Sequence, residues 1–106
     1  MTIDSDLFVW AVKSLNGEIT REMRLVALRA VGRKYTFRYY LDREPTDFVR
    51  EQAEIVAVNF DAGLLNIEEL NIEFVKTSEP LGKLDNLDAA LFRRWENDKG
   101  GVIPNP

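Results

Sequence analysis

The chain has 106 residues, of which 45% are hydrophobic and 30% are charged, and its formal net charge is −4. This composition is typical of one compact domain and excludes an intrinsically disordered chain. Cysteine and histidine are both absent, which excludes disulfide bonds, zinc sites built on those residues, thiol nucleophiles and Ser-His-Asp triads. The N-terminus lacks the basic start of a signal peptide, and the longest apolar run, residues 7–12, is too short to span a bilayer. We therefore expect a cytoplasmic protein without a membrane partner.

The first predicted element is a helix with Asp4 or Ser5 as its N-terminal cap and Gly17 as its stop. Asp and Ser cap helices by accepting a hydrogen bond from a free backbone N–H, and glycine adopts the left-handed conformation that stops a helix. The apolar residues recur at three- and four-residue spacing and therefore share one face: Leu7, Trp10, Ala11 and Leu15.

Two strands, residues 25–31 and 34–41, are predicted next, joined as an antiparallel hairpin by a turn at Gly32 and Arg33. The second strand alternates, and one of its faces carries Tyr35, Phe37, Tyr39 and Leu41. Aromatic residues interleaved with basic ones also resemble a base-stacking platform. A domain of this size needs those rings in its core, so we expect no nucleic-acid partner.

A second helix is predicted after Pro45, with Thr46 or Asp47 as its N-terminal cap and its end at residues 61–63. We expect its apolar stripe to be buried: Phe48, Val49, Ala53, Val56 and Phe60.

Residues 70–75 alternate as a third strand. The segment after Leu84 has leucines at helical spacing but also alternates as an edge strand does, so the pattern alone leaves both assignments open.

Charge is concentrated in the middle of the chain, where residues 42–73 carry two basic and nine acidic side chains. Paired carboxylates such as Glu51 and Glu54 are the only catalytic chemistry that the composition leaves open. They lie among other charges, which favours an exposed acidic face over an enzyme that uses carboxylates alone. A calcium loop and a glycine-rich phosphate loop are both missing, so we expect no metal, no cofactor and no enzymatic activity.

Several segments together resemble the immunity proteins of contact-dependent growth inhibition and related bacterial polymorphic toxin systems. The likeness covers about residues 5–96 and is carried by residues 14–20 (SLNGEIT), 24–28 (RLVAL), 37–42 (FRYYLD), 45–46 (PT) and 92–96 (FRRWE), with Glu51, Glu54 and Phe60 between them. The resemblance implies an α+β fold of order α-β-β-α-β-β, with two helices packed on a small antiparallel sheet of about four strands. It also implies that the closing segment is a strand, although residues 88–90 (DAA) depart from the bulky pattern there. We expect one domain over residues 1–98 and a flexible tail over 99–106.

The resemblance implies a non-enzymatic role, in which the protein binds and neutralises a cognate toxin domain, often a nuclease, in the cytoplasm. A nuclease needs positive charge to hold phosphates, and an acidic protein can cover that surface. The expected partner-binding residues are therefore the carboxylates of the middle third: Asp47, Glu51, Glu54, Asp61, Glu68 and Glu69. Residues 93–96 are the second choice for a partner contact, although ion pairs within the fold are favoured there. An acidic structural or assembly subunit with an unrelated protein partner is the alternative function.

Overall fold

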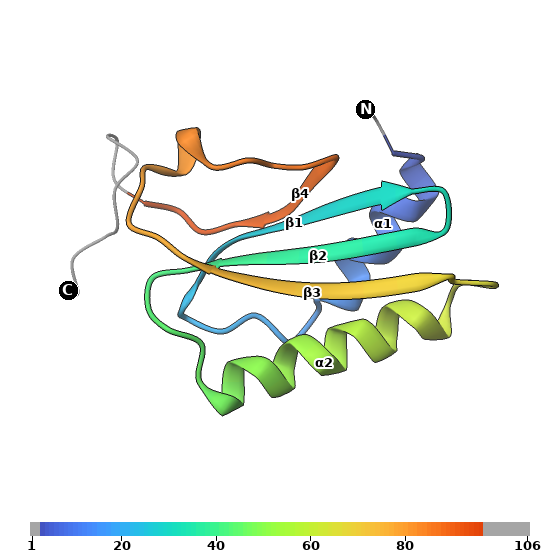
Figure 1. Cartoon of the computed structure of the whole chain (residues 1–106), viewed down its shortest axis with the longest axis horizontal. Helices are drawn as coiled ribbons and strands as arrows, with labels where there is room; N and C mark the ends of the chain where they lie inside the picture. Colours follow the sequence, from blue (N-terminus) through green and yellow to red (C-terminus); the bar gives the residue numbers. More distant parts are fainter. Residues whose placement is uncertain (1–2, 97–106) are drawn as a thin grey trace.

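The computed structural model describes residues 3–96, which form two α-helices, four strands and one short 3-10 helix. In chain order these are α1 (Ser5–Ser14), β1 (Met23–Val31), β2 (Lys34–Leu41), α2 (Asp47–Ala62), β3 (Glu69–Lys76), η1 (Leu81–Lys83) and β4 (Ala89–Arg93). The strands form one sheet in the order β3-β2-β1-β4 (Figure 1). The α+β class, the element order and the strand at the end are thus confirmed. The tail predicted at 99–106 lies outside the described residues.

The sheet is mixed, which corrects the expected antiparallel arrangement. Strands β1 and β2 pair antiparallel, as do β1 and β4, but β3 pairs parallel to β2, with Lys34 opposite Glu69 and Leu41 opposite Lys76. The cause is the length of α2, whose 16 residues span about 24 Å. The helix returns the chain to the end of the sheet at which β2 begins, so β3 runs in the same direction as β2 (Figure 1).

The main core lies between the helices and one face of the sheet. It joins Ala11 and Leu15 of α1 to the α2 residues Val49, Ala53, Val56 and Phe60 and to the helix-facing residues of β1 and β2. The predicted alternation of β2 is confirmed, because Tyr35, Phe37, Tyr39 and Leu41 all belong to this core. Phe60 meets two of these rings edge-on, at centroid distances of 5.1 Å from Tyr35 and 5.0 Å from Phe37.

Helix α2 follows the predicted pattern with one exception. Thr46 caps its N-terminus by accepting a hydrogen bond from the backbone N–H of Val49, as predicted. Four of the five residues expected in its buried stripe are buried, but Phe48 is 58% exposed. The prediction for Phe48 was wrong because successive residues on a helix are turned by about 100°, which places Phe48 outside the stripe formed by Val49, Ala53 and Phe60.

The opposite face of the sheet is covered by the segment between β3 and β4. Leu25, Ala27 and Tyr40 pack there against Leu81 of η1. The pairing of β4 is irregular beside the DAA segment, with a register shift at Val26 and Ala27. Further along β1, the side chain of Asp88 accepts a hydrogen bond of 2.8 Å from the backbone N–H of Ala30. The Asp88 carboxylate thus accepts a bond from β1 that a strand carbonyl would otherwise accept.

Candidate partner-binding surface

All six carboxylates expected to meet a partner are exposed. Asp47, Glu54 and Asp61 are seven residues apart and therefore lie along one side of α2, with Glu51 next to them. Asp61 was expected on the loop after the helix but lies in its last turn, and Glu69 is the first residue of β3. Only Glu68 belongs to the connection between the two elements. The structure thus brings four of the six residues together on one helix.

These six carboxylates differ in whether other side chains of the protein already form ion pairs or hydrogen bonds with them. Glu68 forms an exposed ion pair of 3.2 Å with Arg33, and Glu69 accepts a hydrogen bond of 2.8 Å from the side-chain amide of Asn71. Within residues 3–96, the four carboxylates of α2 form no ion pair. They can therefore receive cations from another molecule without first releasing one of their own.

The same helix exposes apolar side chains that the sequence pattern did not predict at this surface. Phe48, Ile55 and Val58 are 58%, 41% and 66% exposed, and Leu65, three residues after the helix, is 89% exposed. Their spacing of seven, three and seven residues is a helical signal that could have revealed a second apolar stripe. That signal was missed because Phe48 was assigned to the buried stripe.

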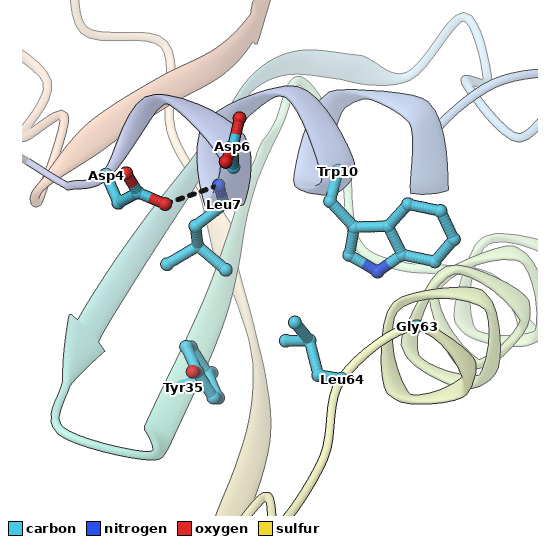
Figure 2. A pocket seen from close by; sticks show the side chains of 7 residues that line it. All are labelled: Asp4, Asp6, Leu7, Trp10, Tyr35, Gly63 and Leu64. Atoms are coloured by element: carbon cyan, nitrogen blue, oxygen red, sulfur yellow. Dashed lines mark hydrogen bonds between the residues drawn. The ribbon is translucent and has the colours of Figure 1, made fainter.

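A hollow of about 450 Å³ lies between α1, the start of β2 and the end of α2 (Figure 2). Its apolar lining comes from Leu7, Trp10, Tyr35 and Leu64, and two carboxylates join them: Asp4, which caps α1, and Asp6 in its first turn. Trp10 joins the helices here, because its indole N–H donates a hydrogen bond of 2.9 Å to the carbonyl of Phe60 and its ring lies against Gly63. A Cβ at position 63 would overlap the ring, so this packing requires glycine.

Residues 93–96 are the second choice for a partner contact, but their charged side chains form hydrogen bonds and ion pairs within the fold. Arg24, in the bulge of β1, forms a buried pair with Glu96, with Nη2 2.7 Å from Oε1 and Nε 2.9 Å from Oε2. Arg94 binds the same carboxylate at 3.0 Å and Asp42 at 2.9 Å. Burial alone would raise the pKa of Glu96, but the hydrogen bonds from Arg24 and Arg94 outweigh it and hold that pKa below its ordinary value. The preference for ion pairs within the fold is thus confirmed for Arg94 and Glu96.

The described residues offer no catalytic arrangement of carboxylates on α2. Glu51 and Glu54 are both exposed on the helix, outside any buried site. Within residues 3–96, no group of three acidic side chains is placed to hold a metal ion. None of the helices in that range has the length and hydropathy needed to traverse a bilayer.

Comparison with known proteins agrees with a binding role. Among curated proteins, no sequence matches the chain. Residues 4–96, however, match the family described as MafI2 immunity protein. This match covers most of the chain and nearly all of the described residues. The likeness to polymorphic toxin immunity proteins is thereby confirmed, and the role is to neutralise a toxin and not to catalyse a reaction. The chain belongs to the MafI2 immunity protein family, and its partner is a cognate Maf toxin.

Proposed function

We propose that the protein neutralises its toxin by covering a positively charged, nucleic-acid-binding surface with the acidic side of α2 and the connection to β3. The contact residues are Asp47, Glu51, Glu54, Asp61, Glu68 and Glu69. The observation that carries the proposal is the row of exposed carboxylates on α2 that form no ion pair within residues 3–96. A toxin that cleaves nucleic acid must present cations to phosphates, and these carboxylates are complementary to them.

The charge distribution of the whole chain supports the same surface. The net charge is only −4, but residues 42–73 carry nine acidic and two basic side chains. Helix α2 has four carboxylates and a single cation, Arg50. The guanidinium carbon of Arg50 lies 5.2 Å from the centre of the Phe74 ring on β3, so this cation is directed toward the sheet. The charged groups that a basic partner would meet on the outward side of α2 are therefore carboxylates.

The place of action follows from the same proposal, whereas the route of delivery is a separate expectation. An immunity protein must meet its toxin where the toxin acts, and nucleic-acid substrates lie in the cytoplasm. Delivery of the toxin by contact between cells stays a prediction, which growth of mixed cultures with and without cell contact would test.

The decisive experiment is coexpression with the cognate toxin domain, followed by tandem purification and an assay of RNA and DNA cleavage. We expect the two chains to purify together and cleavage to stop at a one-to-one ratio. The variant Glu51→Lys/Glu54→Lys should weaken binding by at least about 2 kcal/mol in calorimetry, because two cations then face the cations of the toxin.

Glu79→Lys is the control, since Glu79 is exposed on the connection between β3 and η1, away from α2. A melting curve of each free variant reports whether the fold is intact. Unchanged affinity in the double variant, with its melting temperature preserved, would place the interface elsewhere. Failure of the chains to associate would contradict the proposal as a whole.

A further inference from the structure

Helix α2 has an outward surface that is divided along its length into two different halves. Phe48, Ile55 and Ala62 are seven residues apart and line one side, while Asp47, Glu54 and Asp61 have the same spacing and line the other. Glu51 and Val58 lie between these two sides, and the three large exposed apolar residues Phe48, Ile55 and Val58 are called the apolar row below. The side chains of Phe48, Ile55 and Val58 are large, and much of their surface is exposed to water. The core-facing side of the helix is already formed by other residues.

Contacts at the margins of α2 fix which way each half faces. Asn59, next to the apolar row on the helical circumference, donates a hydrogen bond of 3.3 Å to the carbonyl of Ser14 in α1. Arg50, next to the acidic row, lies over the Phe74 ring of β3. The apolar half is therefore on the α1 side and the acidic half on the β3 side, where Glu69 begins the strand.

We infer that the apolar row of α2 is the energetic centre of the toxin interface, and that the acidic row guides the toxin into place. This inference rests on the proposed function and names the partner surface it requires. The toxin must present apolar side chains over about 15 Å, the distance from Phe48 to Val58 along a helix, with arginine or lysine along one margin only. That margin lies on the β3 side of α2.

Physical principles assign different kinetic effects to the two rows. Burial of large apolar side chains at the centre of an interface excludes water and mainly slows dissociation. Charges at a margin act over about 8 Å at physiological ionic strength and mainly speed association. Three large side chains beside unpaired carboxylates fit this division, whereas a surface that bound by charge alone would have no use for an exposed Phe48.

The test is a kinetic measurement with the purified cognate toxin domain, made catalytically inactive and immobilised. Phe48→Ala and Val58→Ala are compared with Val31→Ala, a control of similar exposure (59% against 66% for Val58) at the end of β1. We expect the double variant Phe48→Ala/Val58→Ala to dissociate at least about tenfold faster, with its association rate within about twofold of wild type. Val31→Ala should leave both rates unchanged.

Alanine favours helix, so the double variant should keep α2, and circular dichroism melting checks this. Val58→Lys provides a second route, because a cation at this exposed position should repel the basic margin of the toxin and shorten the complex lifetime further. Dissociation of the double variant no faster than that of Val31→Ala, with the helix intact, would overturn the inference while leaving the proposed function standing. Absence of wild-type binding would instead overturn the proposed function.

Discussion

Two neighbouring tyrosines on β2 illustrate how the surroundings of one hydroxyl group decide its effect on stability. Tyr39 is fully buried, its ring stacks on Phe74 at 5.6 Å, and its hydroxyl has no hydrogen-bond partner within the described residues. Tyr40 points to the other face, where its hydroxyl donates a hydrogen bond of 2.9 Å to the carbonyl of Asp85. Burial raises the pKa of Tyr39 well above its ordinary value, which is another sign of a poorly solvated hydroxyl.

We expect Tyr39→Phe to raise the free energy of unfolding by about 1–2 kcal/mol, because it removes a buried polar group that gains no hydrogen bond in the fold. Tyr40→Phe should lower the free energy of unfolding by about 1 kcal/mol, since it deletes a satisfied hydrogen bond. Urea titrations of both variants and wild type would measure the two changes. Destabilisation by Tyr39→Phe equal to that by Tyr40→Phe would mean that the Tyr39 hydroxyl has a partner in solution.

Several elements are held together by one buried charge network. Besides its pair with Glu96, Arg24 of β1 donates a hydrogen bond of 3.0 Å to the carbonyl of Thr77, just after β3. Arg94, just after β4, reaches Asp42 at the end of β2. The network therefore connects the ends of all four strands at one edge of the fold.

Removal of the Glu96 carboxylate should destabilise the protein in a manner that depends on pH. Because the pKa of Glu96 is lower in the folded state than its ordinary 4.5, the carboxylate stabilises the fold above that pH and loses this effect as pH falls through the folded-state pKa. Glu96→Ala should lower the free energy of unfolding at pH 7 by about 3–5 kcal/mol, since it leaves Arg24 buried without its partner.

Urea titrations between pH 3 and pH 7 would follow this change. The gap between wild type and Glu96→Ala should narrow as the pH decreases below 4.5, while Glu79→Ala, in an exposed loop, should follow wild type throughout. Part of the pH dependence should persist in Glu96→Ala. Hydrogen bonds from Arg43 and Arg94 outweigh the effect of burial on Asp42 and lower its pKa as well. A constant gap at all pH values would exclude the proposed role of the Glu96 charge.

The predictability of these elements from sequence depends on how local their causes are. Helix caps, the turn at Gly32 and the alternation of β2 are set by residues a few positions apart, and each was predicted. The parallel pairing of β3 depends on where α2 ends in space, and the pair of Arg24 with Glu96 joins residues 72 positions apart. The acidic side of α2 was predictable from charge alone. Its apolar side was not, because a single sequence does not say which of two adjacent apolar residues, Phe48 or Val49, enters the core.

At the scale of the whole molecule, a small net charge hides a strongly uneven distribution. Residues 1–41 carry seven basic and four acidic side chains, whereas residues 42–73 carry two basic and nine acidic ones. The sheet places these segments together, as Arg33 meets Glu68 and Arg38 meets Glu73 at 2.8 Å. Such pairs cancel charge along β2 and β3, so the unpaired carboxylates of α2 should dominate the field that an approaching toxin meets.

Two substitutions that change net charge equally can separate the field of α2 from that of the whole molecule. Glu54→Lys and Glu79→Lys each raise the net charge from −4 to −2, but only Glu54 lies on the outward side of α2. With the cognate toxin domain in stopped flow at low salt, we expect Glu54→Lys to slow association by about tenfold and Glu79→Lys by less than about twofold. The difference should disappear near 1 M salt, where screening limits the reach of charges to about 3 Å. Equal slowing by both substitutions would show that net charge steers the toxin, and α2 would then contribute only after the two proteins are in contact.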